Sequence, residues 1–197
     1  MVEPDFSLID PLKPSPRAWL DSVLADFDGF LADHASCEKK ASGMAMSMAS
    51  HYPDKPELLS AMADLAVEEL SHYREVIRLM LQRGVYPTPD TKDPYINALN
   101  RLVRKGADVF LMDRLLLGAI VERRGAERFA CIAEAVTEPM LQKFYQAIAA
   151  SEARHWTLFY TLAWRHCDQR EVNERFRALT TIEAEIMLGL PYRAALH

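Results

Sequence analysis

The chain has 197 residues, half of them hydrophobic, a formal net charge of −5 and three cysteines. This length and apolar content predict a single domain, residues 1–197, built around one sizeable core. An odd number of cysteines without a Cys-x-x-Cys pair is typical of reduced thiols, so a cytoplasmic protein is expected. The opening segment MVEPDFSLIDPLKPSP is acidic and broken by proline, unlike a secretory signal peptide. No apolar run reaches the roughly 18 residues of a membrane-spanning helix, so no membrane partner is expected.

Helix start and stop signals predict two long helices in the first half of the chain. The first, about residues 15–51, has Pro16 in its first turn and stops at Tyr52-Pro53-Asp54. The second, about residues 56–84, ends at Gly84, because glycine readily adopts the left-handed conformation that terminates a helix.

The second half of the chain repeats this pattern after an irregular stretch at residues 85–93, where a bundle would cross over between two helical pairs. A short helix to about residue 105 and a long one over residues 107–136 are expected next. Two more follow, one that begins near Pro139 and a last one capped by Asp168. No strand alternation is sustained over about five residues, so the prediction is an all-α four-helix bundle with extra helices.

The sequence contains one pattern of glutamate and histidine twice, and this repeated pattern indicates metal binding. A glutamate is followed 31 residues later by Glu-x-x-His, and the same pattern recurs with a separation of 30 residues. The six residues are Glu38, Glu69, His72, Glu122, Glu152 and His155. Residues three apart share a helix face, so each Glu-x-x-His directs a carboxylate and an imidazole to one point. This is the ligand set of carboxylate-bridged two-metal bundles, and its imidazoles favour iron over calcium or magnesium. A site for two iron ions is therefore predicted.

Alternatives to this ligand set remain open. Glu68 is four residues from His72 and could replace Glu69, and Glu127 could replace Glu122, although either choice breaks the matched spacing. Buried charge pairs without a metal are a further interpretation, at the cost of burying carboxylates. Glu68 and Ser151 directly precede ligand glutamates. Each is a candidate to hydrogen-bond the second ring nitrogen of a ligand histidine, and the alternative is that both simply lie on the surface.

The sequence around these residues resembles a known family. The strings EELSHYREV, IVERRGAERF and SEARHWTLFY, with HASCEKKA around Glu38, are similar to the tRNA 2-methylthio-isopentenyladenosine hydroxylases, the MiaE family of ferritin-like di-iron monooxygenases. The resemblance spans essentially the whole chain. It implies a ferritin-like fold, a tRNA substrate and oxygen-dependent hydroxylation of the isopentenyl group of a modified adenosine next to the anticodon. Ala126 departs from the threonine that some bacterial hydrocarbon monooxygenases place there, so their proton relay does not carry over.

The chemistry implies further requirements. Hydroxylation of an unactivated C–H bond needs a metal cofactor and dioxygen as co-substrate. The chain has no Gly-x-Gly-x-x-Gly fingerprint for a flavin or nicotinamide. An external electron donor, a separate reductase or electron-transfer protein, is therefore expected.

Basic residues exceed acidic ones only in the second half of the chain, which permits an anionic partner. The densest basic group is the candidate tRNA contact, with a solvated face as the alternative: Arg101, Arg104, Lys105, Arg123, Arg124 and Arg128. Two other functions share some of these features. A ferritin-like iron oxidase, storage protein or rubrerythrin-type peroxidase would use the same six ligands without an RNA surface. A non-enzymatic helical binding module would carry the Glu-x-x-His pairs by accident.

Overall fold

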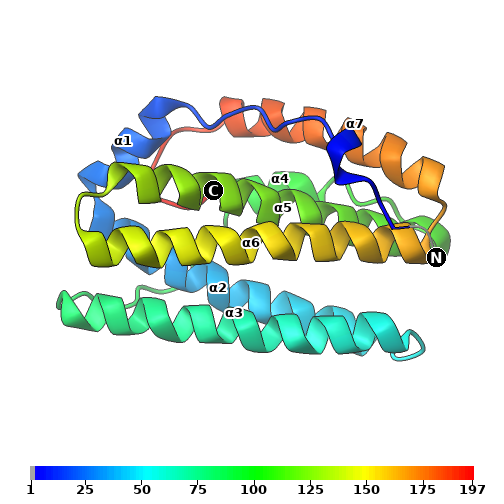
Figure 1. Cartoon of the computed structure of the whole chain (residues 1–197), viewed down its shortest axis with the longest axis horizontal. Coiled ribbons are helices and arrows are strands. Elements are labelled where there is room, and N and C mark those ends of the chain that lie inside the picture. The colour runs from blue at the N-terminus through cyan, green and yellow to red at the C-terminus, as the bar shows by residue number, and fades with distance from the viewer. Residues whose placement is uncertain (1–2) are drawn as a thin grey trace. The chain divides into compact units, whose positions relative to one another are not determined.

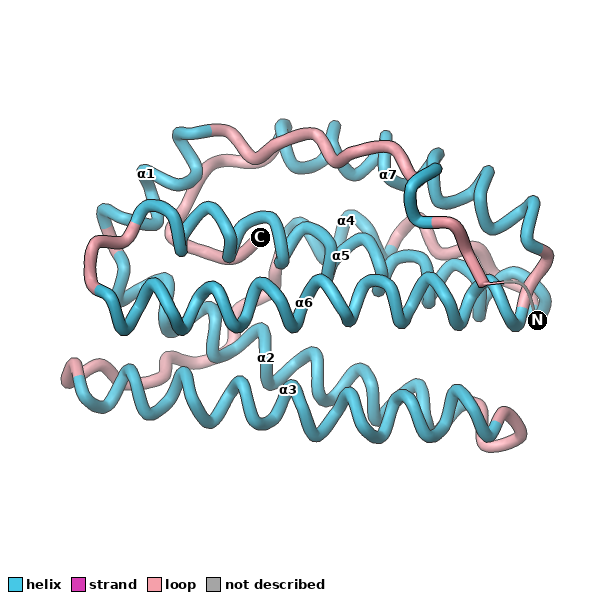
Figure 2. Tube along the Cα trace, viewed as in Figure 1, coloured by secondary structure: helices cyan, strands magenta, loops and turns pink. Residues whose placement is uncertain are grey.

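The computed structural model describes residues 3–197, apart from the side chain of Asp108, so the first two residues of the opening segment lie outside the described part. Every regular element in this range is helical: a short 3-10 helix, Phe6–Leu8, and seven α-helices (Figure 2). No helix of the described residues is long and apolar enough to cross a membrane. The chain forms two compact units, one containing Ala18–Thr91 and Tyr192–Leu196, the other containing the chain up to Arg17, Lys92–Pro191 and His197. The single domain of the sequence analysis stays a prediction.

The unit around Ala18–Thr91 contains α1 (Arg17–Ala25) except for its first residue, together with α2 (Phe27–His51) and α3 (Pro56–Gln82). The helices α2 and α3 lie side by side as a hairpin (Figure 1). The side chain of Ser42 fastens this pair, because its hydroxyl donates to the backbone carbonyl of Ala66 at 2.8 Å.

The single helix predicted over residues 15–51 is wrong in one respect, because the chain breaks at Asp26 into α1 and α2. The Asp26 carboxylate accepts a hydrogen bond from the backbone N–H of Gly29 at 3.0 Å and so caps a new helix. A side chain at Gly29 would collide with this cap, since an added Cβ would lie 2.3 Å from Asp26 Oδ2. The Asp-Phe-Asp-Gly sequence thus carries a helix start inside an apparently continuous helix.

The predicted end of the next helix is confirmed. Gly84 has φ of +71°, and the N–H of Val85 donates to the carbonyl of Met80 at 2.9 Å. This closes the helix end as a left-handed glycine cap does. The segment that follows is tied back to α2, because Lys39 Nζ contacts both carboxylate oxygens of Asp90 and Lys40 Nζ donates to the carbonyl of Thr91.

The other unit contains α4 (Pro94–Asn100), α5 (Ala107–Ala135), α6 (Pro139–His166) and α7 (Gln169–Gly189). The α5 and α6 helices lie side by side (Figure 1), and they approach closely at Gly118, where an added Cβ would lie 2.9 Å from the Phe159 ring. The helix starts expected at Ala107, Pro139 and Asp168 are confirmed, and the Asp168 carboxylate accepts from the N–H of Glu171 at 3.0 Å.

The α4 helix is shorter than predicted and ends at Asn100, five residues before the expected boundary at residue 105. Asp113 gives the physical reason. Its carboxylate accepts the backbone N–H of Arg104 at 2.9 Å and also binds the Arg104 guanidinium. Arg175 of α7 binds the same carboxylate. The backbone N–H of Arg104 therefore donates to this carboxylate, whereas in a longer α4 it would donate to a carbonyl of the same helix.

A buried ion pair joins α7 to α5. The guanidinium of Arg124 donates two hydrogen bonds to the carboxylate of Glu183, Nε to Oε1 at 2.8 Å and Nη2 to Oε2 at 3.0 Å. Both side chains are fully buried, and Tyr95 of α4 donates its hydroxyl to Glu183 Oε1 at 2.9 Å. Such a bidentate, hydrogen-bonded pair fixes the relative position of these three helices.

Candidate metal centre

The α2–α3 hairpin brings three of the six predicted ligands together. Glu38 comes from α2, and Glu69 and His72 lie one turn apart on α3. All three are buried. The His72 Nδ1 atom lies 3.3 Å from Glu69 Oε2 and 3.6 Å from Glu38 Oε2. One ligand atom from each residue lies within 4.8 Å of the others. We call these three residues the α2–α3 ligand cluster.

The electrostatics of this cluster favour a cation. Burial lowers the pKa of His72, but hydrogen bonds and charges from Glu38 and Glu69 outweigh it and raise that pKa to about 10. Two buried carboxylates that favour a proton on the neighbouring imidazole favour any other cation at the same place. A metal ion supplies the same compensation.

The α5–α6 pair brings the other three ligands together. Glu122 comes from α5, and Glu152 and His155 lie one turn apart on α6. These side chains are also buried, His155 Nδ1 lies 3.5 Å from Glu152 Oε2, and one ligand atom of each residue lies within 4.8 Å of the others. We call them the α5–α6 ligand cluster. The duplicated spacing of the sequence thus appears as two clusters of equal composition.

The close approach of α5 and α6 positions this second cluster. Gly118, Glu122 and Gly125 share the face of α5 that meets α6, because they are four and three residues apart. An added Cβ at Gly125 would lie 3.9 Å from Glu152 Cγ. The distance at Gly125 is an ordinary van der Waals contact, so the close approach of the two backbones depends on Gly118, one turn before Glu122.

The sequence did not single out one histidine of α2 that lies beside a predicted ligand. His34 is fully buried, and its Nε2 atom lies 2.7 Å from Glu38 Oε1. Its spacing of four residues from Glu38 places it on the same helix face and is the signal that could have revealed it. A hydrogen bond from behind fixes a ligand carboxylate in the orientation that a metal needs.

The supporting roles predicted for Ser151 and Glu68 have different structural settings. Ser151 is buried, and its hydroxyl oxygen lies 3.4 Å from His155 Nε2, opposite the ring nitrogen that faces Glu152. Glu68 is only half-buried on α3, and its role stays a prediction. The rival ligand Glu127 is engaged elsewhere, because its carboxylate accepts from the N–H and hydroxyl of Ser15 and from Arg124.

The donor chemistry of the two clusters fits transition-metal ions. Each cluster offers two carboxylates and one imidazole, and in each the Nδ1 atom of the histidine faces a carboxylate. Carboxylates can bridge two ions and balance their charge, while imidazole selects iron-like metals over calcium or magnesium. Each compact unit therefore contains a buried set of donors suited to a metal.

The predicted RNA contacts lie in several environments. Arg101 and Lys105 are exposed in the segment between α4 and α5, where Arg104 is bound to Asp113. Arg123 is half-buried, donates to the carbonyl of Asp10 at 2.8 Å and lies over the Trp156 ring at 5.1 Å.

Two of the predicted RNA contacts lie in the interior. Arg124 is fully buried against Glu183, and Arg128 is buried, with its Nε donating to Ser15 Oγ at 3.1 Å. Burial lowers the pKa of Arg128 to about 10, because the opposing effect of Tyr95 and of the Glu127 and Glu183 charges is smaller, and the charge of Arg124 adds to the lowering. Neither guanidinium can reach an RNA backbone from this position, because both are enclosed by protein. Both guanidinium groups bind protein groups instead, Arg124 the Glu183 carboxylate and Arg128 the Ser15 hydroxyl.

The chain is similar to proteins of known activity over nearly its whole length. Residues 7–197 match the family described as tRNA-(MS[2]IO[6]A)-hydroxylase (MiaE). A curated relative from Pseudomonas putida, named tRNA 2-(methylsulfanyl)-N(6)-isopentenyladenosine(37) hydroxylase, is 37% identical over 174 residues, which cover 88% of this chain and 84% of the relative. A protein of the same name from Salmonella typhimurium is 31% identical over 157 residues, 80% of this chain and 57% of that protein.

Among solved structures, a Synechococcus protein with aldehyde deformylating oxygenase activity is 34% identical, with a TM-score of 0.90 and coverage of 96% of both chains. This match confirms the predicted all-α, ferritin-like fold class. The family match and the relatives confirm the resemblance found in the sequence. The chain belongs to the MiaE family of tRNA hydroxylases.

Proposed function

We propose that this protein hydroxylates the isopentenyl group of 2-methylthio-N6-isopentenyladenosine in tRNA, next to the anticodon, with dioxygen as the oxidant. The observation that carries the proposal is the pair of buried Glu, Glu and His clusters, in a chain that belongs to a family of tRNA hydroxylases. The names of both curated relatives support the substrate.

The α2–α3 and α5–α6 ligand clusters together hold two iron ions in this proposal. Their equal composition supports it, since a glutamate from each of two helices and Glu-x-x-His from each of two others is the ligand set of two-metal bundles. When bound, the irons supply the one-electron chemistry that converts C–H to C–OH with dioxygen, which no side chain can supply. Insertion of one oxygen atom and release of the other as water consumes two electrons and two protons. The electrons come from a separate reductase or electron-transfer protein.

The protein's own residues hold the donors in place and keep water away. His34 fixes Glu38 through its 2.7 Å contact, and Ser151 lies at the Nε2 side of His155. Buried apolar side chains of the same helices, such as Met62, Ala66 and Phe159, keep solvent away from the ligands. A preorganised and dry pocket limits loss of the oxidant to solvent.

For the tRNA, we propose that Arg101 and Lys105 contact phosphates, with Arg104 sharing its charge between RNA and Asp113. The exposure of this basic segment supports the assignment. We also propose a cytoplasmic location, which the tRNA substrate supports.

The experiment that tests the function is nucleoside analysis of tRNA. Iron-loaded protein, a chemical reductant and dioxygen are incubated with tRNA that carries 2-methylthio-N6-isopentenyladenosine, and with tRNA that lacks the isopentenyl group. We expect a hydroxylated nucleoside, heavier by one oxygen atom, only from the prenylated tRNA. Iron uptake without any hydroxylated nucleoside would favour the alternatives of iron storage or a rubrerythrin-type peroxidase.

One other activity has a specific observation in its favour. The Synechococcus protein with aldehyde deformylating oxygenase activity shares 34% identity and the fold with this chain. Incubation of the same iron-loaded protein with long-chain aldehydes, and assay for the shortened product, separates the two functions. We expect turnover of the tRNA and none of the aldehyde, because the curated relatives named as tRNA hydroxylases include one at 37% identity.

A further inference from the structure

The α3 helix has hydrophobic side chains on two faces. One face is buried and includes Met62 and the predicted metal ligands Glu69 and His72. The other face is exposed and carries a row of apolar residues, which we call the α3 outer stripe: Leu59, Ala63, Val67, Leu70 and Leu81. These residues lie on one side of the helix, because successive members are four, four, three and eleven positions apart. A surface helix ordinarily carries polar side chains on its outer side, so a second apolar stripe indicates a second contact surface.

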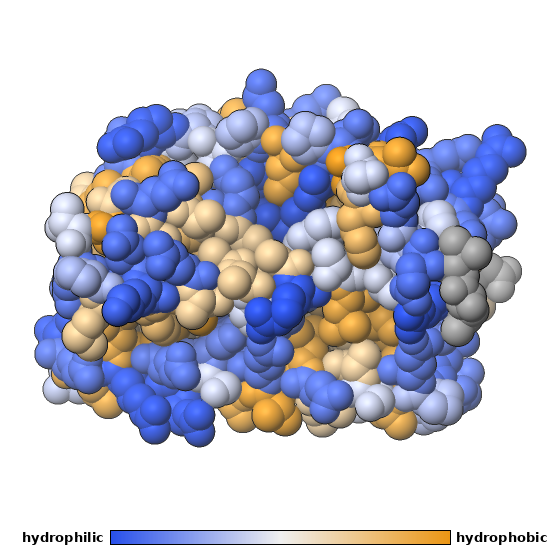
Figure 3. Space-filling view, viewed as in Figure 1, coloured by the Kyte–Doolittle hydropathy of each residue, from blue (hydrophilic) through white to orange (hydrophobic). Residues whose placement is uncertain are grey.

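The side chains of the stripe are open to solvent. Val67 is 71% exposed, Leu70 is 53% exposed and Leu81 is 54% exposed. Figure 3 shows hydrophobic side chains between hydrophilic ones along its lower edge, where α3 runs in the same view (Figure 1). Single exposed hydrophobic residues are common on protein surfaces, whereas a continuous exposed apolar patch marks a site of contact with another molecule.

The charges beside the stripe are placed symmetrically along the helix. Asp64 lies five residues before the level of residue 69, and Arg74 lies five residues after it. Both side chains are exposed. If two copies of α3 lie antiparallel, with a twofold axis at this level, Asp64 of each copy comes opposite Arg74 of the other. The same surface therefore offers an anion and a cation at the positions where a second copy needs them.

The apolar residues follow the same symmetry. Val67 and Leu70 lie on either side of the level of residue 69, so the twofold axis brings Val67 of one copy opposite Leu70 of the other. Leu59 lies ten residues before this level and Leu81 twelve residues after it, so these two leucines also come opposite each other. The stripe is thus complementary to itself in both its apolar and its charged members.

We propose that two copies of this chain associate through their α3 outer stripes as an antiparallel dimer with twofold symmetry. Such an interface uses one patch of each copy, and that patch must complement itself. An RNA backbone fits this face less well, because apolar side chains offer phosphates no partner and Asp64 would repel them. The ligands Glu69 and His72 lie on the buried face of α3, so they stay inside each copy. The proposal is independent of the tRNA hydroxylation.

Analytical ultracentrifugation of the iron-loaded protein, over a series of micromolar concentrations, tests the proposal. We expect a reversible dimer. Val67→Glu buries a charge beside the twofold axis and should weaken dimerisation by at least about tenfold. Met140→Glu is the matched control, because Met140 is 73% exposed on α6 and lies outside the stripe.

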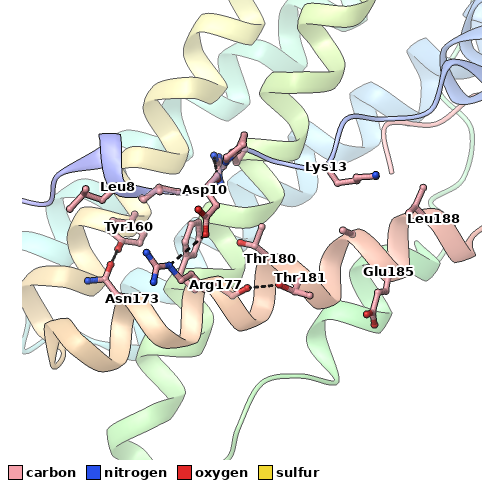
Figure 4. Close-up of a pocket in the computed structure, with 15 residues that line it drawn as sticks. Leu8, Asp10, Lys13, Tyr160, Asn173, Arg177, Thr180, Thr181, Glu185 and Leu188 are labelled. Atoms are coloured by element: carbon pink, nitrogen blue, oxygen red, sulfur yellow. Dashed lines mark hydrogen bonds and ion pairs between the residues drawn. The ribbon is translucent and has the colours of Figure 1, made fainter.

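Leu70→Glu is the second interface variant and should weaken dimerisation by a similar factor. Its matched control is Leu188→Glu, because Leu188 is also exposed, at 46%, on α7. Leu188 lies at the edge of a cavity that charged side chains such as Asp10 and Arg177 line (Figure 4). A glutamate there should leave the dimer unchanged.

An exchange of charges tests the antiparallel pairing. Asp64→Arg and Arg74→Asp each bring like charges together at two places in the dimer, so each variant alone should dimerise about tenfold more weakly. In an equimolar mixture of the two variants, every facing pair again has opposite charges. The mixed dimer should therefore form with nearly the affinity of the wild-type dimer.

Circular dichroism and iron content should be unchanged in all six variants, because each change is at an exposed position. A wild-type protein that stays monomeric would overturn the proposal and leave the stripe to a different protein, such as the electron donor. Val67→Glu and Leu70→Glu variants that dimerise as well as their controls would also overturn it. A dimer whose charge variants do not recover on mixing would contradict the antiparallel arrangement.

Discussion

The imidazole of His34 and the carboxylate of Glu38 form a buried hydrogen-bonded pair, with Nε2 2.7 Å from Oε1. The other oxygen of the same carboxylate lies 3.6 Å from His72 Nδ1. One oxygen of the Glu38 carboxylate is thus hydrogen-bonded to His34, and the other lies near the predicted ligand His72. The orientation of Glu38 depends on a residue outside the predicted ligand set.

The first prediction concerns this pair. Replacement of His34 by phenylalanine keeps a buried ring but removes the hydrogen bond, so metal affinity should fall by about 10- to 100-fold. His51→Phe is the control, because His51 is exposed at the end of the same helix. Iron titration of both variants, with circular dichroism to verify folding, measures the difference. Equal iron affinity in the two folded variants would show that Glu38 needs no such support.

The second prediction concerns the contact between α5 and α6. An added Cβ at Gly118 would lie 2.9 Å from the Phe159 ring, one helical turn from Glu122 on α5. Gly118→Ala should therefore destabilise the protein by about 1–3 kcal/mol through overpacking and also reduce iron retention. Gly43→Ala in α2 meets no atom within 4 Å and should be slightly stabilising. Urea unfolding measures the stability of both variants. If Gly118→Ala is as stable as wild type, the packing of α5 against α6 does not require glycine at position 118.

Much of this architecture follows from local sequence signals. Pro56, Gly84 and Asp168 mark helix boundaries through their own backbone chemistry, so these boundaries were predictable. The break at Asp26 and the early end of α4 were not, because they depend on a short capping contact inside a helical pattern and on Asp113, nine residues from Arg104.

In the candidate site, too, some features were predictable from the sequence and others were not. Two copies of one spacing indicated the ligands, since periodicity places them on common helix faces. Whether a charged residue is buried depends on tertiary packing, which spacing does not encode. Arg124 and Arg128 therefore looked like a basic surface, although Glu183 and Ser15 enclose them. The pairing of Arg124 with Glu183 joins positions 59 residues apart.

The third prediction concerns acid stability. Burial raises the pKa of Asp113, but hydrogen bonds from Arg104 and Arg175 outweigh it, so the pKa is lowered in the folded state. A lowered pKa contributes stability above the ordinary aspartate value of about 3.9, and this stability is lost as pH falls through the folded-state pKa.

Asp113→Asn should therefore lower the free energy of unfolding by about 2 kcal/mol at neutral pH, and the gap to wild type should shrink below about pH 4. Urea unfolding across pH measures it, with the exposed Asp54→Asn as control. A gap that is constant down to the lowest pH at which both proteins fold would mean that the charge of Asp113 is immaterial.

The fourth prediction concerns the RNA surface. Replacement of Arg101 and Lys105 by glutamine should weaken tRNA binding and reduce the slope of log affinity against log salt by roughly 0.7 to 0.9 for each phosphate that the protein no longer neutralises. Iron content should not change. Arg78→Gln, an exposed arginine of α3, is the comparison. An unaltered salt slope in the double variant would place the tRNA on another face.

The most direct test of the central claim is iron content and hydroxylation measured together in variants of the two ligand clusters. Wild-type protein loaded with ferrous iron without oxygen should bind about two irons per chain and hydroxylate prenylated tRNA. His72→Ala and His155→Ala, one from each cluster, should each remain helical, lose most of the iron and lose all hydroxylation. A folded His155→Ala protein that keeps both irons and full activity would contradict the claim that both clusters serve one di-iron centre.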